Sequence, residues 1–399
     1  MRVNAQPAVL LITAHGRQLL EPEPGERVVD LLARNGVPWS GVSIYKVPAG
    51  GGAGTPLPCL DLRPSEIEDA SELLIYLNRN VNPFLFALDP LTVVPPEPAE
   101  KGAAEYIYQD IRSDRGNSAT YLKKLSPEEC RVVVANKAAE VITEHLPQGS
   151  DLVVGVSGGG DSNALLDALS RLANHKIAVH PLIIKGIPEW DSGVDRAQAL
   201  CNNYGLRLTV FEEDEVKALL QMPGSSSLAA SFEKAFPGDD FEFLGTLLVR
   251  LALFERARQL GTQYVATGLN LEDVLCENLF RLSNGNRPAS APLREIGEFK
   301  LAFPLWLCPK RIIDGCFPRQ SLANYDERYP CLSAGRNLYY SIVYTLQSSY
   351  PGYSERLAKG LSEVAKSDPV KYVIDEELGF HVERFVPFPL RQRFKRIRA

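Results

Sequence analysis

Short apolar runs alternate with longer amphipathic segments between residues 127 and 282. Continuous apolar runs are typical of strands buried in a sheet, and apolar residues spaced three or four apart are typical of helices. The predicted strands are 153–156, 177–184, 206–211 and 264–267, and the predicted helices are 127–145, 163–172, 193–204, 244–260 and 271–282. This alternation predicts an α/β fold, a parallel sheet with helices on both faces that binds ligands at the carboxyl ends of its strands.

The first 92 residues have a different pattern, which predicts a separate small α+β domain. Apolar runs at 8–13, 18–20, 42–47 and 72–77 read as strands, and 28–33 as a short amphipathic helix. The order strand, strand, helix, strand, strand resembles a β-grasp (ubiquitin-like) fold. Without a free Gly-Gly terminus this domain is not expected to carry sulfur itself. We expect it to dock a protein partner or sulfur donor, or to form a homodimer contact.

Composition shifts suggest the remaining boundaries. The stretch DPLTVVPPEP from Asp89 to Pro98 reads as a stiff linker. We expect a β-grasp-like domain at 1–92, a Pro-rich linker at 93–112, the α/β domain at 113–330, and a C-terminal helical segment with a basic tail at 331–399.

Composition and charge indicate a soluble enzyme. The chain has 399 residues, of which 45% are hydrophobic, and seven scattered cysteines. These are expected to be reduced thiols in the cytoplasm, and neither a membrane span nor a signal peptide is predicted. The net charge of −6 does not favour binding to nucleic acid. The exception is the basic tail, which is either a solvated end or an RNA contact. Its basic residues are Arg391, Arg393, Lys395, Arg396 and Arg398.

The segment VVGVSGGGDS, from Val153 to Ser162, is the strongest chemical signal. A strand leads into three glycines and then into a helix. Glycines let backbone N–H groups approach a ligand, and a helix N-terminus attracts anions. The loop has neither the Lys-Ser/Thr ending of a Walker loop nor the spacing of a dinucleotide fingerprint. It is therefore a phosphate-binding loop of another kind, or else only a tight turn.

A second polar loop follows the strand at 264–267. In ATGLNLEDVL, Asp273 stands near the start of the next helix. An acidic residue there can be an ordinary first-turn residue. Because Mg²⁺ needs only one or two protein carboxylates, Asp161 and Asp273 could also hold Mg²⁺ over bound phosphates.

These segments resemble the PP-loop ATP pyrophosphatases, most of all the tRNA cytidine thiolation and tRNA lysidine synthetase-like enzymes. The loop resembles their SGGxDS motif, and 268–273 resembles GHHxDD. Segments at 182–189, 303–311 and 329–352 follow in the family's order, so the resemblance covers about Glu128 to Ala365.

The resemblance implies which residues would bind ATP. Nucleotide-binding positions would be Ser157, Gly158, Gly159, Gly160, Asp161, Ser162, Lys185 and Gly268, and reaction roles would fall to Asp161, Asp273, Arg250 and Cys331. Arg250 matches one arginine of the family's LRRG segment. Lys185 follows the strand whose end would meet the adenine.

The departures from the family concern its iron–sulfur cluster. The family's CxxC falls on Glu242 and Gly245, and of its PCxxC segment Cys331 remains while Ala334 stands at the second position. Because a cluster needs three or four cysteine ligands, none is expected. Further replacements are Gly160 for Lys, Asn270 for His, Glu272 for Asp and Cys276 for Glu. Cys308 and Cys316 are spaced poorly for ligands.

Three functions remain open. The first is ATP-dependent activation of a carbonyl-type oxygen, with release of AMP and pyrophosphate, for sulfur insertion into a tRNA base. In it, Cys331 would be a persulfide carrier or a resolving thiol, or otherwise only a half-buried thiol. The second is adenylation of a small-molecule or protein carboxylate or amide, with the N-terminal domain recruiting a partner. The third is a non-catalytic ATP-binding scaffold.

Overall fold

The computed structural model describes residues 6–13, 16–35, 42–50, 54–57, 62–77, 106–108, 123–222, 226–237, 241–317, 339–340, 342–343, 346, 353–384, 392 and 394–397. The chain divides into two compact units. The first comprises Met1–Val133, Leu271–Asn284 and Cys308–Gly360, and the second comprises Val134–Asn270, Gly285–Leu307 and Leu361–Ala399. The boundaries predicted from composition stay a prediction.

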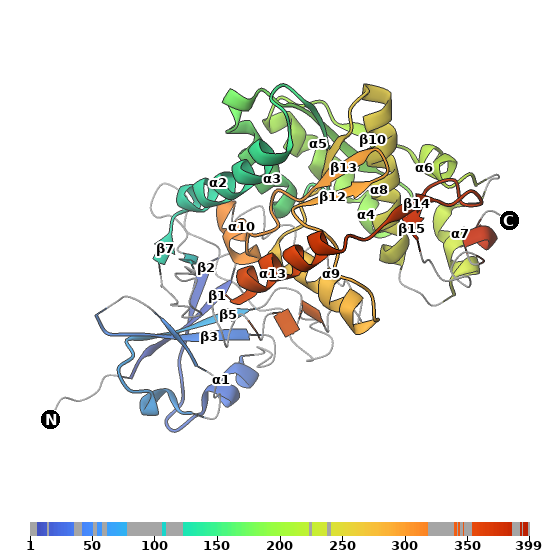
Figure 1. Ribbon diagram of the computed structural model, residues 1–399. Coiled ribbons are helices and arrows are strands. Elements are labelled where there is room, and N and C mark those ends of the chain that lie inside the picture. The colour runs from blue at the N-terminus through green and yellow to red at the C-terminus, as the bar shows by residue number, and fades with distance from the viewer. Residues whose placement is uncertain are drawn as a thin grey trace. The chain divides into compact units, whose positions relative to one another are not determined.

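The N-terminal sheet of the first unit has the topology of a β-grasp fold. Its strands are β1 (Ala8–Thr13), β2 (Gly16–Leu20), β3 (Val42–Val47), β4 (Thr55–Pro56) and β5 (Glu72–Leu77). They lie in the order β2-β1-β5-β3-β4, with β1 and β5 parallel and the other neighbours antiparallel. The short helix α1 (Val28–Arg34) lies beside these blue strands in Figure 1.

Successive side chains along a strand point to opposite faces of the sheet, and this explains how the sheet packs. Val9 and Leu11 on β1 share a buried cluster with Leu31 and Leu32 of α1, because side chains two residues apart face the same side of a sheet. The intervening Leu10 belongs to a second buried cluster, which also contains Tyr45, Val47 and Leu74. The predicted α+β fold of this part of the chain is confirmed, and buried apolar side chains lie on both faces of its sheet.

Four further elements lie wholly in the first unit. They are β6 (Tyr106–Tyr108), β7 (Lys123–Leu125), α9 (Leu271–Ser283) and α10 (Lys310–Cys316). β6 lies inside the stretch predicted to be a linker and pairs antiparallel with β7. Helices α2 (Pro127–His145) and α13 (Tyr353–Ser367) each begin in the first unit and end in the second.

The second unit contains the predicted parallel sheet. Its strands are β8 (Asp151–Gly155), β9 (Ala178–Ile184), β10 (Thr209–Phe211), β11 (Tyr264–Ala266), β12 (Leu293–Ile296) and β13 (Phe299–Ala302). The order is β10-β9-β8-β11-β13-β12, parallel except for β12 at one edge. The hairpin β12–β13, which turns at Gly297 with φ +62°, was not predicted from the sequence.

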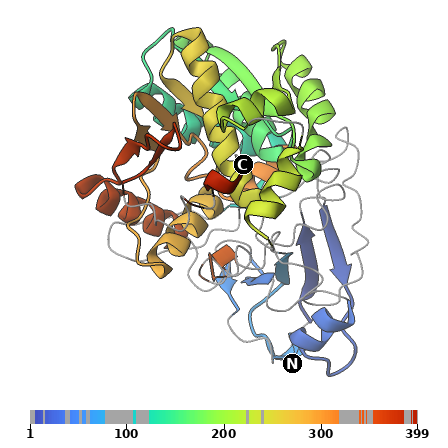
Figure 2. The ribbon, with the colours of Figure 1, turned by 90° about the vertical axis from the view of Figure 1, so that its right-hand side faces the viewer.

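Helices surround this sheet. They are α3 (Gly160–Ser170), α4 (Pro188–Asp191), α5 (Gly193–Asn203), α6 (Glu213–Leu219), α7 (Leu228–Ala235) and α8 (Phe241–Leu260). The long helix α8, yellow in Figure 2, packs on β8, β9 and β11. Leu152, Val153 and Val154 on β8 are 0% exposed. Such continuous burial is typical of a strand covered on both faces, which is why its sequence reads as an unbroken apolar run.

Strand order places the two polar loops side by side. The chain passes from β8 outward through β9 and β10, then returns to the other side of β8 as β11. Val153 and Val154 pair with Val265 and Ala266, so the loops that follow β8 and β11 start at adjacent strand ends. Ligands of open α/β sheets bind at such a topological switch point.

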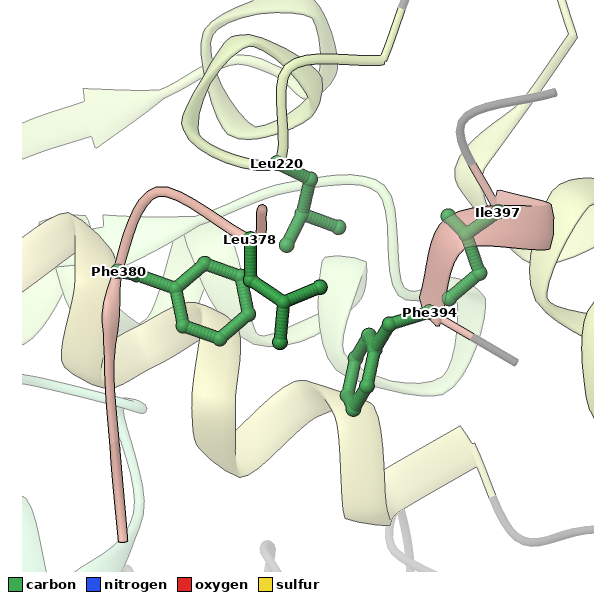
Figure 3. Close-up of a pocket in the computed structure, with 5 residues that line it drawn as sticks. All are labelled: Leu220, Leu378, Phe380, Phe394 and Ile397. Atoms are coloured by element: carbon green, nitrogen blue, oxygen red, sulfur yellow. The ribbon is translucent and has the colours of Figure 1, made fainter. Parts of the chain in front are cut away.

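The basic tail is anchored by apolar side chains. Phe394 and Ile397 are 6% and 4% exposed, and in Figure 3 they converge with Leu220, Leu378 and Phe380. Lys395 pairs with Glu377 at 2.7 Å, whereas Arg396 is exposed. The expectation of a wholly solvated end is therefore corrected for this stretch, because residues three apart on a helical turn face the same side.

Among the described helices, none combines the length and the apolar character needed to cross a membrane.

Candidate functional site

The glycine loop after β8 fits tightly against the start of α5. Gly158 has φ +75°, and a Cβ there would lie 2.6 Å from the backbone nitrogen of Ala197. Only glycine combines that conformation with that close approach. Across the loop, Ser162 Oγ accepts from the Ser157 N–H at 2.9 Å and lies 3.2 Å from Ser157 Oγ. The loop is thus held in one shape by its own residues.

No side chain of the N-cap residue caps the N-terminus of α3. Its N-cap residue, Gly159, has extended backbone and provides no side-chain hydrogen bond. The first-turn N–H groups of a helix have no partners within the helix, and together with the helix dipole they attract an anion. The binding of nucleotide phosphates by Ser157 to Ser162 stays a prediction.

The loop after β11 meets Asp161, the acidic residue in the first turn of α3. A Cβ on Gly268 would lie 3.5 Å from Asp161 Cβ and from its carbonyl oxygen. Asn270 donates from Nδ2 to Asp161 Oδ1 at 3.4 Å. In the same loop the Thr267 hydroxyl oxygen is buried, with no hydrogen-bond partner among the described residues. The structure thus brings Asp161 and Gly268 together and adds Asn270 and Thr267, which the sequence did not assign to the site.

Lys185 lies just beyond β9, and its side chain already has a partner. Its Nζ lies 3.1 Å from Glu212 Oε1, and the lysine side chain is 37% exposed. The next residue, Gly186, has φ +102° and donates its N–H to Asp191 Oδ1 at 3.0 Å. This turn at the carboxyl end of β9 is well ordered by local bonds. The predicted contact of Lys185 with nucleotide stays a prediction.

Asp273 belongs to the first unit, where its carboxylate accepts a hydrogen bond from the Tyr340 hydroxyl. The neighbouring Glu272 is 2% exposed and accepts from the Lys310 N–H at 2.9 Å. Glu272 thereby joins the first turn of α9 to the first residue of α10. The pairing of Asp273 with Asp161 around Mg²⁺ stays a prediction.

Arg250 contacts the C-terminal hairpin formed by β14 (Tyr372–Ile374) and β15 (His381–Glu383). It donates from Nη2 to the His381 carbonyl at 3.4 Å, and its guanidinium carbon lies 5.9 Å from the centre of the Tyr372 ring. Burial, and then the charge of Arg250, lower the pKa of His381. These contacts attach the hairpin to α8, and a reaction role for Arg250 stays a prediction.

The described cysteines are buried thiols. Burial raises the pKa of Cys130 to about 12 and that of Cys201 to about 11, so both are protonated at neutral pH. Cys276, Cys308 and Cys316 are also buried. No cluster of three or more His, Cys, Asp or Glu that could hold a metal occurs in the described part of the chain. Cys331 and Ala334 lie outside the described residues.

Gly245 does not fit a cluster ligand. It stands where the resembled family has the second cysteine of CxxC, and a Cβ there would lie 2.5 Å from the Trp190 ring and 3.0 Å from Ile187 Cδ1. The indole of Trp190 therefore fills the space that a cysteine side chain needs. Real Cβ atoms essentially never approach another heavy atom that closely, so a thiolate at position 245 requires Trp190 to move.

Restoring the family's two cysteines should therefore not restore a cluster. In the double variant Glu242→Cys/Gly245→Cys we expect no stoichiometric iron after anaerobic reconstitution. We also expect a free energy of unfolding lower by about 1–3 kcal/mol, the usual cost of overpacking. Iron analysis, visible absorption and denaturant unfolding measure both effects. The single variant Glu242→Cys is the control for the added thiol. A cluster band in the unaltered protein that is lost in Cys308→Ser would contradict this prediction.

No protein-family model and no curated protein matches the sequence. Solved structures do match. The U34-tRNA thiolase NcsA from Methanococcus maripaludis, described with its 4Fe–4S cluster, has a TM-score of 0.51 at 17% identity over 72% of this chain and 92% of its own. An NH3-dependent NAD synthetase from Campylobacter jejuni has a TM-score of 0.35 at 16% identity, over 62% of this chain and 99% of its own.

At 17% identity, the likeness to the thiolase concerns the fold alone. The chain therefore has the predicted adenine-nucleotide α-hydrolase-like fold, and its membership of the PP-loop ATP pyrophosphatase superfamily stays a prediction.

Proposed function

We propose that the protein uses ATP to adenylate an acceptor oxygen and releases pyrophosphate. One observation carries this proposal. The Ser157–Ser162 loop lies at the switch point of the sheet, where Asn270, from the loop after the neighbouring strand β11, contacts the Asp161 carboxylate.

The reaction follows from what these residues can hold. Loop N–H groups, the N-terminus of α3 and the hydroxyls of Ser157 and Ser162 would bind the β- and γ-phosphates. The acceptor oxygen attacks the α-phosphorus, and the bond from that phosphorus to the bridging oxygen breaks. AMP is then attached to the acceptor, and pyrophosphate leaves with the electron pair. Asp161, with Asp273 as the predicted second ligand, would hold Mg²⁺, which neutralises phosphate charge. Positioning and charge stabilisation are the protein's main contributions to such a transfer.

Product analysis tests the proposal. The protein is incubated with Mg²⁺, labelled ATP and, in separate reactions, total tRNA, a carboxylate mixture or no acceptor. In one acceptor reaction we expect release of pyrophosphate, with AMP attached to the acceptor. In a parallel reaction that contains unlabelled ATP and labelled pyrophosphate, we expect the label to enter ATP. ADP and phosphate as the sole products would disprove the proposal.

The acceptor we favour is a tRNA base, with sulfur as the nucleophile that displaces AMP from the activated carbon. Two features support it: the sequence resemblance to tRNA cytidine thiolation enzymes, and the basic residues of the tail. Cys331 is the proposed persulfide carrier, which requires its thiolate form. The N-terminal domain would recruit the sulfur donor.

A second candidate is adenylation of a small-molecule or protein carboxylate or amide. Two observations favour it: Trp190 fills the cluster-ligand position at Gly245, and the net charge of the chain is −6. Here an amine or another nucleophile would displace AMP, and the N-terminal domain would bind the partner. Mass spectrometry of modified nucleosides from co-purified RNA separates the two candidates.

If RNA is the acceptor, the charges of the tail should set the salt dependence of binding. Replacing Arg391, Arg393, Arg396 and Arg398 by glutamine leaves the anchoring residues Phe394 and Ile397 in place. Each lost phosphate contact should flatten the log–log salt slope by about 0.7 on single strands, so the total change should reach about 3. Filter binding at several salt concentrations measures the slope.

The control is Arg207→Gln, which removes an exposed arginine outside the tail. ATP binding should be unchanged in both variants. A salt slope that is the same with and without the tail charges would remove the tail from the RNA interface.

A further inference from the structure

Asn270 is a buried polar residue at the centre of the proposed site. Its side chain is 4% exposed, and it stands immediately before α9, which begins at Leu271. Buried amide groups are nearly always hydrogen-bonded. Asn270 directs Nδ2 to Asp161 Oδ1, 109 residues away in the sequence and within the same unit.

The loop after β11 packs against Asp161 at Gly268. A Cβ on Gly268 would lie 3.5 Å from Asp161 Cβ, which is an ordinary van der Waals distance. The amide of Asn270 then reaches one carboxylate oxygen. An N–H donor on one of the two carboxylate oxygens favours one orientation of the carboxylate. At 3.4 Å the contact is longer than the usual N–H···O bond of about 2.7–3.2 Å. It is therefore weak and withdraws little of the charge of the carboxylate.

We infer that Asn270 is a positioning residue, which orients the Asp161 carboxylate toward the metal ion that accompanies ATP; this inference rests on the proposed function. Groups that hydrogen-bond to metal ligands typically change metal affinity by about 10–100-fold when they are removed. A purely structural asparagine would affect the stability of the loop and leave the metal dependence of ATP binding unchanged.

The test measures ATP binding by calorimetry at increasing Mg²⁺ concentration, so no acceptor is needed. Asn270→Leu keeps the volume of the side chain and removes its donor. We expect the Mg²⁺ concentration for half-maximal ATP binding to rise about 10-fold or more, with a small change in the thermal midpoint. Asn270→His replaces the amide by a ring N–H donor. It should bring the Mg²⁺ concentration for half-maximal ATP binding most of the way back to that of the parent protein. If the leucine variant does not fold, Asn270→Ala takes its place.

Asn163→Ala is the matched control. Asn163 is also 4% exposed, and its Oδ1 accepts from the Tyr204 hydroxyl at 2.8 Å. Its loss should lower the thermal midpoint and leave the Mg²⁺ dependence unchanged. An unaltered Mg²⁺ dependence in Asn270→Leu, alongside normal Mg²⁺-dependent binding in the parent protein, overturns the inference alone. Failure of the parent protein to bind ATP at any Mg²⁺ concentration overturns the proposed function.

Discussion

Asp161→Asn should reduce the rate of AMP and pyrophosphate formation by about 10²–10³-fold, the usual effect of removing one electrostatic contributor to a transition state. The substitution keeps the shape of the side chain and removes its negative charge. Asp161 stands in the first turn of α3, beside the loop that would bind the phosphates, and its carboxylate is the proposed metal ligand. Initial rates at saturating ATP, with the acceptor identified by product analysis, measure the loss.

Asp167→Asn is the matched control for that experiment. Asp167 lies on the same helix, but its carboxylate pairs with Arg171 at 2.8 Å. This is a partly exposed pair of residues four apart, of the kind that contributes little to stability. We expect the rate to stay within about twofold of the parent, because the lost pair weakens α3 only slightly. Equal losses in the two variants would point to the stability of α3 and contradict a specific role for Asp161.

Gly158→Ala should disrupt the phosphate loop and lower the free energy of unfolding by about 2–4 kcal/mol. Two costs add: a left-handed backbone for a residue with a Cβ, and overpacking. Gly158 has φ +75°, and the new Cβ would lie 2.6 Å from Ala197 N and 2.8 Å from Arg196 Cβ. Because backbone cannot rotate aside as a flexible side chain can, the loop itself must shift. Denaturant unfolding measures the stability, and calorimetry measures ATP binding, which we expect to weaken at least tenfold.

Gly149→Ala separates the two costs. Gly149 has φ +79°, nearly the same conformation, and no atom lies within 4 Å of the position that a Cβ would take there. Its substitution should cost about 1 kcal/mol and leave ATP binding unchanged. If both alanine variants lose the same free energy of unfolding and both bind ATP normally, the close packing of the loop on α5 has no functional importance.

Local sequence signals account for most of the elements. The buried run at 152–154 predicted β8, and the glycines followed by good helix formers predicted α3. Two missed helices also carried readable signals. At the start of α6, Glu212 and Glu215 form a capping box, and the Ser227 hydroxyl accepts from the Ala230 N–H at 3.2 Å to cap α7. Both helices are short, so their periodicity was too brief to stand out.

The basic tail shows a second way in which the sequence-based prediction was wrong. Its basic residues dominate the composition of the last nine positions, and they suggested a solvated end. The apolar pair at 394 and 397 has helical spacing, and it is this pair that packs beside Leu220 and Leu378. Burial of two large apolar side chains offsets the cost of ordering the segment.

The sequence by itself determined the α/β class and the strand, glycine loop and helix at 153–172, because these depend on periodicity and on glycines within a few residues of one another. Tertiary structure alone decided which distant residues meet. Asn270 reaches Asp161 only because β11 pairs with β8 in one register. Trp190 fills the space above Gly245 because α4 packs against α8. Such contacts depend on strand order and on close approach of backbones, and the local pattern of apolar and polar residues predicts neither.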